Sequence, residues 1–311
     1  MTSPKLAGAT DHGRMYARTR GGTLEVPSIT TVLDVLNQHM EWWEARCAVD
    51  LAYEHAERLA RVAALPNGPE KWQQERAAKE WLRGAATRDR DESSERGDFV
   101  HDYAEVWALK SIGKATDADV EAHRSDCERA GGADFLPHFH RFWDDFNPRV
   151  VIPEATVWNH TVGYAGTTDL LCEIEVQGVV TPVVVDWKTK KALYKRNGQP
   201  KDQDLRDYTG MQLSAAANGE EVWLPGEAED GSQDAWGPMT FKAEVGLAVA
   251  IAPDGYAVRQ YAIQHPPMFR RFKALRDAWE FYREGPRMMS EKLSGPQDIR
   301  LPRRSVVGAV A

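Results

Sequence analysis

The chain has 311 residues, which suits one large domain or two small ones and allows a sizeable core. Hydrophobic residues make up 42% and charged residues 28%, an ordinary balance for a globular protein. The net charge of −8 argues against a surface coated in positive charge for non-specific nucleic-acid binding, although it does not exclude a local basic groove.

Membrane insertion and secretion are not indicated. No apolar run approaches the roughly 20 residues that a helix needs to span a bilayer. The N-terminus has basic residues but lacks the apolar stretch of a signal peptide. The three cysteines, Cys47, Cys127 and Cys172, are far apart and form no CxxC pair, so the sequence predicts a reducing cytoplasm and no cysteine-based metal site.

The first half of the chain reads as helical. The first clear element is "VPSITTVLDVL" at 26–36, where Ser28 can cap a helix that buries Ile29, Val32, Leu33 and Leu36. Residues 39–147 predict further helices, with breaks at "LPNGPE" (65–70), near Gly113 and at "GGADF" (131–135).

The character changes at Pro148. Three strands are predicted at 149–160, 162–176 and 178–189, with a turn at 159–163, followed by a helix at 202–219. A hairpin around "PDG" (239–263) and a final helix follow, and one face of that helix carries Met268, Phe272, Leu275, Trp279 and Tyr282. The order predicts an α/β (α+β mixed) fold, in which helices flank a mixed central sheet and a helical region precedes it.

The stretch "VVVDWKTKKA" (183–192) places two charged residues at the end of a buried strand. Asp186 and Lys188 lie two apart and therefore share one face of the strand. Alone, this triplet is more typical of a salt bridge. Asp169 opens the core of the preceding strand and could lie near the same end of the sheet, unless it merely caps a turn. Two such carboxylates repel each other, and a hard divalent cation such as Mg²⁺ would remove the conflict.

Two helical segments add candidate residues. In "RGDFVHDYAE" (96–105), His101 and Glu105 share one helical face, although a lone histidine there is usually structural. In "YTGMQLSAAA" (208–217), Tyr208 and Gln212 share a face and could orient a lysine or a phosphate, or simply belong to an amphipathic helix.

Two stretches combine basic and aromatic residues, as expected for contacts with phosphates and bases. The first, at 188–196, supplies the candidate DNA-binding residues Lys190, Lys191, Lys195 and Arg196. For the second, at 269–276, an ordinary solvated basic face is the better interpretation.

Taken together, "RGDFVHDYAE", "GTTD", "VVVDWKTK" and "YTGMQLSAA" resemble, in order, the motifs of the PD-(D/E)xK nuclease superfamily, and most closely its RecB-like and Cas4-like exonucleases. Many phage-encoded members also open with a segment like "VPSITTVL". The resemblance implies a restriction-endonuclease-like core at 148–288, after an N-terminal segment (1–24) and a helical region (25–147), with a C-terminal tail at 289–311.

The resemblance also implies a role for each motif residue. The metal ligands would be His101, Asp169, Asp186 and the backbone carbonyl of Trp187. Lys188 would orient or activate the attacking water, and Gln212 with Tyr208 would support it. Two departures stand out: Ala216 occupies the position of a frequent family tyrosine, and the cysteines cannot supply the four ligands of the Cas4 iron–sulfur cluster, so no such cluster is expected.

The resulting hypothesis is a Mg²⁺- or Mn²⁺-dependent exonuclease that hydrolyses DNA phosphodiesters from a free end. The resemblance places it in phage DNA recombination, repair or replication in the host cytoplasm, with a recombination or replication protein as a possible partner and no membrane. Two alternatives stay open: a structure-specific or restriction-like endonuclease, and a catalytically inactive DNA-binding protein on the same fold.

Overall fold

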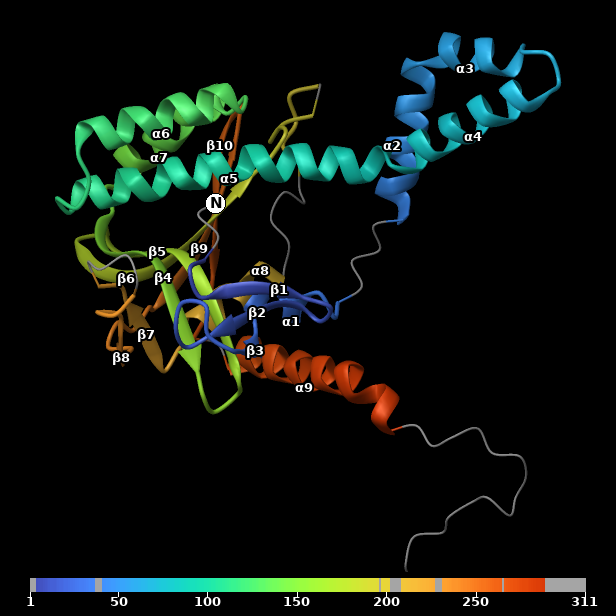
Figure 1. Cartoon of the computed structure of the whole chain (residues 1–311). Coiled ribbons are helices and arrows are strands. Elements are labelled where there is room, and N and C mark those ends of the chain that lie inside the picture. The colour runs from blue at the N-terminus through green and yellow to red at the C-terminus, as the bar shows by residue number, and fades with distance from the viewer. Residues whose placement is uncertain are drawn as a thin grey trace, which may run out of the picture.

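The centre of the molecule is a seven-stranded mixed sheet with helices on both faces (Figure 1). This computed structural model describes residues 4–36, 41–195, 197–201, 208–226, 231–264 and 266–288. The strands follow the order β10-β9-β6-β5-β4-β7-β8, in which only β6 and β9 pair in parallel. The predicted α+β class is confirmed. The strands are β4 (Arg149–Asn159), β5 (Tyr164–Val176), β6 (Val179–Thr189), β7 (Glu221–Leu224), β8 (Ala235–Pro238), β9 (Val245–Ala252) and β10 (Gly255–Tyr261).

Strand β6 is buried on both faces, which explains its nearly unbroken apolar sequence. Val183, Val185 and Trp187 pack in one cluster with helices α5 (Ala85–Ser111) and α7 (Leu136–Phe146). Val184 packs in the opposite cluster with α1 (Ile29–Leu33), α8 (Tyr208–Ala217) and α9 (Pro266–Met288). Asp186 and Lys188 continue the alternation of Val184, so the strand delivers both to the α8 side.

A second, three-stranded sheet precedes α1, where the sequence predicted no element. It consists of β1 (Ala7–Thr10), β2 (Gly13–Ala17) and β3 (Leu24–Pro27), so the predicted boundary at 24/25 falls at the start of β3. Tyr16 on β2 and Leu6 are buried against Trp158 and Ala165 of the main sheet. The predicted cap of α1 is confirmed, since the Ser28 hydroxyl accepts a hydrogen bond from the Thr31 N–H at 2.9 Å.

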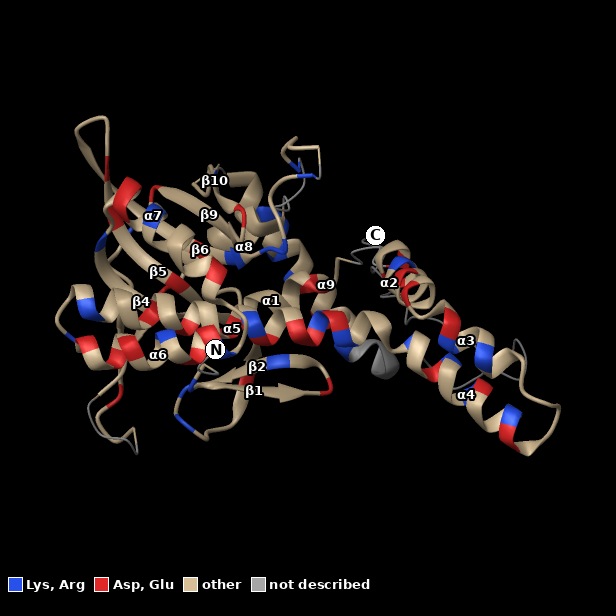
Figure 2. Ribbon diagram, turned by 90° about the horizontal axis from the view of Figure 1, so that it is seen from above, with Lys and Arg blue, Asp and Glu red and all other residues tan. Residues whose placement is uncertain are grey.

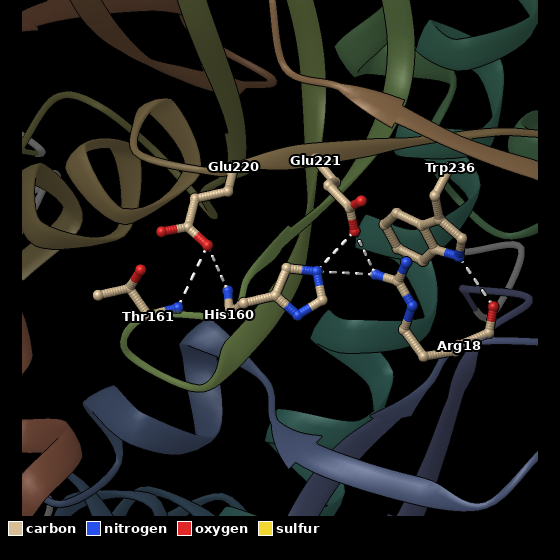
Figure 3. A network of polar contacts seen from close by, with 6 residues as sticks. All are labelled: Arg18, His160, Thr161, Glu220, Glu221 and Trp236. Atoms are coloured by element: carbon tan, nitrogen blue, oxygen red, sulfur yellow. Dashed lines mark hydrogen bonds and ion pairs between the residues drawn. The ribbon is translucent and has the colours of Figure 1, made fainter.

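Polar contacts attach this small sheet to the edge hairpin β7–β8, which the sequence also did not predict (Figure 3). The Arg18 guanidinium donates to Glu221 at 2.7 Å and lies over the Trp236 ring at 4.2 Å. His160 in the β4–β5 turn contacts the same carboxylate at 2.7 Å. Glu220 accepts from the backbone N–H of His160 at 2.7 Å. The edge strands therefore depend on a network drawn from four separate segments.

Helices α2 (Glu41–Glu54), α3 (Ala56–Ala63) and α4 (Pro69–Arg83) form an arm that projects beyond the N-terminal end of α5 (Figures 1 and 2). None of their side chains is fully buried. The predicted breaks at 65–70, near Gly113 and at 131–135 are confirmed. Gly113 lies between the end of α5 at Ser111 and the start of α6 (Asp117–Arg129), and the last break contains the short helix η1 (Ala133–Phe135). In α9, Phe272 and Trp279 are buried as predicted, but Tyr282 is exposed.

Among the described residues, no helix is long and apolar enough to cross a membrane. The three cysteines are free thiols; burial raises the pKa of Cys127 to about 11 and that of Cys172 to about 12.

Candidate active site

The candidate site lies where β5 and β6 separate. Their ladder ends at the pair Leu170–Val185. Two residues beyond Val185, the Trp187 N–H donates to the Asp169 carboxylate at 2.6 Å instead of to a backbone carbonyl. Because the N–H and C=O of a strand residue point toward the same neighbouring strand, the Trp187 carbonyl faces this opening as well. Asp169 thus occupies the mouth of the opening rather than a turn.

Asp186, Lys188 and Gln212 form a closed set of contacts beside this opening. The Lys188 ammonium lies 2.7 Å from Asp186 Oδ2 and 3.4 Å from Gln212 Oε1. The Gln212 amide donates to Asp186 Oδ1 at 2.6 Å. The strand-end salt bridge therefore exists, and α8 adds an amide that holds both of its members.

His101 reaches the site because α5 approaches β6 closely. A Cβ on Gly97 would lie 2.8 Å from Thr189 Oγ1, so glycine permits this distance between helix and strand. One turn further along α5, His101 Nδ1 lies 3.3 Å from Asp169 Oδ1. Five of the sequence-predicted residues, which come from four elements, therefore meet here in two sets of contacts: His101 with Asp169, and Asp186 with Lys188 and Gln212. The bond from the Trp187 N–H to Asp169 links the two sets along β6.

Burial and mutual attraction set the charges of this network. Burial raises the pKa of Asp186, and the charge of Asp169 adds to that effect. Burial acts in the same direction on Asp169, but the His101 and Lys188 charges and the hydrogen bonds it accepts outweigh it, so the pKa of Asp169 is lowered. The pKa of Lys188 is raised because Asp186 and Asp169 outweigh its burial, and Asp169 likewise raises the pKa of His101. The two neighbouring carboxylates thus differ in their affinity for a proton.

A third carboxylate, Glu154, was missed by the sequence analysis. It lies on β4 between residues paired with Leu170 and Thr168, and therefore opposite Asp169. Its φ of 46° is in the left-handed region. Burial, together with the charge of Asp169, raises its pKa well above the usual range. The available signal was an acidic residue inside a β-branched strand, "VVIPEATV".

A cavity of about 60 Å³ joins these carboxylates to the small N-terminal sheet. Its walls include Asp169, Asp186 and Glu154 on one side and Arg14 and Tyr16 of β2 on another. Among the described residues, no hydrogen bond or ion pair is made by the Arg14 guanidinium. Ala216, the position of the frequent family tyrosine, also lines this cavity, and the Tyr16 hydroxyl there contacts Thr167 Oγ1 at 3.0 Å.

The remaining sequence-predicted residues differ in their placement. Tyr208 is half-buried at the start of α8. Lys191 pairs with Asp89 of α5, and Lys190 follows β6 beside it. Lys195 is exposed in the following loop, and Arg196 lies outside the described residues. In the stretch 269–276, the aromatic side chains pack against the core, so it is not a stacking surface.

The donor chemistry of the site fits a hard divalent cation, since the buried carboxylate of Asp186, the half-buried carboxylates of Asp169 and Glu154, and a backbone carbonyl lie around one opening. Within the described part of the chain, however, no three His, Cys, Asp or Glu side chains are already arranged to hold an ion together. A cation would have to replace or join the contacts that His101 and Lys188 make with Asp169 and Asp186.

Comparisons with known proteins add little. No family model matches the chain, and no curated protein matches it. A solved structure described as "Crystal structure of SSO0001" is similar to it at 17% identity over 59% of this chain and 73% of that one, with a TM-score of 0.29.

Proposed function

We propose that this protein is a metal-dependent nuclease that hydrolyses DNA phosphodiester bonds, with Mg²⁺ or Mn²⁺ as its cofactor. The observation that carries the proposal is the network in which Asp169, Asp186 and Lys188 lie at one opened end of a buried sheet. A simple salt bridge needs neither the second carboxylate nor the amide of Gln212 that fixes the first.

Each residue has a role that follows from its contacts. Asp169 and Asp186, with the Trp187 carbonyl, would hold the metal, which when bound supplies an activated water and a Lewis acid. Gln212 fixes the orientation of the Asp186 carboxylate. Lys188 holds a compact positive charge beside that carboxylate, where it can orient the attacking water or a phosphate oxygen. His101 fixes Asp169, or takes part in binding the metal.

An exonuclease that needs a DNA end is the form of the proposal that we favour from the motif resemblance, and an endonuclease is its alternative. The second candidate function, an inactive DNA-binding protein on the same fold, is favoured by the absence of a ready-made group of metal ligands among the described residues.

The test is digestion of end-labelled linear and closed circular DNA, single- and double-stranded, with Mg²⁺ or Mn²⁺. Asp186→Asn and Lys188→Ala should each lower cleavage by about 100-fold or more. Glu175→Gln, an exposed carboxylate on the same sheet, is the control and should cleave normally. Full activity in either site variant would refute the proposed roles. Calorimetric titration with Mn²⁺ separates the inactive scaffold, which should show no binding that depends on Asp186.

A further inference from the structure

An open groove of about 390 Å³ lies beside the candidate active site, between α5, the end of β6 and the first helix of the arm. We call it the α5 groove. The lining residues that matter here are Trp43 of α2, Arg90, Ser94 and Arg96 of α5, and Lys190 and Lys191 after β6.

The α5 groove begins beside the site, at Thr189, and continues toward the N-terminal end of α5. His101, Gly97, Ser94 and Arg90 follow one another at intervals of three or four residues, so they form one stripe along α5. His101 contacts Asp169, and Gly97 meets Thr189, the residue after Lys188 that also lines the groove. The part of α5 that lines the groove itself runs from Asp89 to Arg96, which at 1.5 Å per residue is about 10 Å long.

The charge of the groove departs from that of the chain. Four basic side chains line it against one carboxylate, Asp89, whereas the whole chain has a net charge of −8. Arg90 is 65% exposed, and its nearest carboxylate, Asp91, is 3.9 Å away and itself exposed, so this pair holds it only weakly. The Arg96 guanidinium lies over the Phe135 ring at 5.9 Å.

Uncharged side chains that can contact DNA also line the groove. Ser93 and Ser94 add hydroxyls, and the half-buried indole of Trp43 forms part of its wall. Basic groups with hydroxyls suit a phosphate backbone, and an aromatic ring suits a base whose face is open.

We infer that the α5 groove binds a single-stranded segment of DNA that flanks the bond to be cut. This inference rests on the proposed nuclease function. A stacked strand rises about 3.4 Å per nucleotide, so about 10 Å of helix accommodates about three nucleotides. A single strand suits the groove better than a duplex because a base can stack on Trp43 only when it is unpaired.

The test measures binding apart from cleavage. Fluorescence anisotropy of a labelled 10-nucleotide single strand and of a blunt duplex is followed without metal, in the Asp186→Asn background. Arg90→Glu should weaken single-strand binding about tenfold at low salt. Arg76→Glu is the matched control, because Arg76 is 64% exposed and also pairs with a carboxylate, but lies on α4 away from the groove. Arg90→Ala should reduce the slope of log K against log salt by about 0.7.

Trp43 tests the single-strand part of the inference. Trp43→Ala should weaken single-strand binding about fivefold or more, Trp43→Phe should restore most of it, and the blunt duplex should be little affected. Equal single-strand binding by the Arg90→Glu and Arg76→Glu proteins would show that the α5 groove does not bind DNA. If Trp43→Ala weakened the binding of duplex and of single-stranded DNA equally, the groove would have no preference for a single strand. If wild type never cleaves while the groove variants still lose binding, the nuclease proposal fails, and the groove remains a single-strand-binding surface with no bond to be cut beside it.

Discussion

At the residue scale, Arg14 is exposed and lines the cavity that Asp169 and Asp186 also line, and among the described residues its guanidinium makes no hydrogen bond or ion pair. A cation at that position can bind a phosphate oxygen of the substrate. Its structural role is separate, because its backbone carbonyl accepts the bonds from the Ser28 N–H and the Thr31 hydroxyl.

We therefore expect Arg14→Ala to lower kcat/KM for DNA cleavage by about 10- to 100-fold, while the urea midpoint of unfolding stays near that of wild type. Arg14→Lys should be intermediate, since it keeps the charge and loses the planar fork. Steady-state kinetics and urea unfolding measure the two quantities. Wild-type kcat/KM in Arg14→Ala would show that no substrate phosphate depends on this side chain.

The site residues fall into two groups by how far the sequence could predict them. Asp186 and Lys188 are two apart on one strand, so their shared face follows from local geometry alone. Glu154 requires the register of β4 on β5 and a left-handed φ of 46°, which no local pattern encodes. Arg14 requires β2 to lie near the sheet, a placement set by tertiary contacts of Tyr16.

At the element scale, the packing of α5 on β6 depends on Gly97. Alanine is intrinsically better in a helix by about 1 kcal/mol, but its Cβ would lie 2.8 Å from Thr189 Oγ1. We expect Gly97→Ala to lower the free energy of unfolding by about 1 kcal/mol or more. In a Thr189→Ala background, where the nearest retained atom is Cβ at 3.9 Å, the same change should be neutral or stabilising. A double-mutant cycle by urea unfolding measures this, and a stabilising Gly97→Ala in wild type would contradict it.

The edge strands β7 and β8 depend on the network of Figure 3, and this makes their stability depend on pH. Hydrogen bonds from His160 and then Arg18, against the opposing effect of burial, lower the pKa of Glu221. Because the pKa of Glu221 is lowered in the folded protein, its carboxylate stabilises the fold at pH values above its unfolded pKa of about 4.3. This stabilisation is lost as the pH falls through the folded pKa.

Glu221→Gln should therefore lower the free energy of unfolding by about 0.5–1 kcal/mol at pH 7, and its difference from wild type should vanish in acid. Urea unfolding between pH 7 and pH 3.5 measures this difference. Glu175→Gln, exposed on β5, should track wild type throughout. A difference that grows as the pH falls would reverse the assigned sign.

The length of a strand decides whether the sequence could predict it. Strands β5 and β6 are long, and their apolar patterns identify them directly. Strands β1, β3, β7 and β8 have four residues each, too few for a periodic pattern to stand out. Contacts distant in sequence, such as that of Arg20 with Asp234 at 2.7 Å, hold them instead.

At the scale of the whole molecule, the sequence predicts the layers of helix that cover the sheet, but it does not predict the position of the arm. A central strand that is apolar on both faces requires cover on both, which predicts helices on each side. Helices α2, α3 and α4 show no such requirement, because they bury no side chain fully and carry exposed aromatics such as Trp42 and Trp72. Nothing in their pattern of residues fixes where they point.

This contrast predicts uneven stability. Local opening has a low free energy where few apolar contacts must break, and it approaches the global value in the core. In hydrogen exchange, amides of α3 and α4 should therefore exchange well before those of β5 and β6. Helix α6 is the matched control, because it is also on the surface but has a capping box at Thr116 and buries Val120 and Cys127. Its amides should be more protected than those of the arm. Equal protection of α4 and α6 would mean that the arm is covered in solution, and protection that rises with protein concentration would identify a second copy of the chain as the cover.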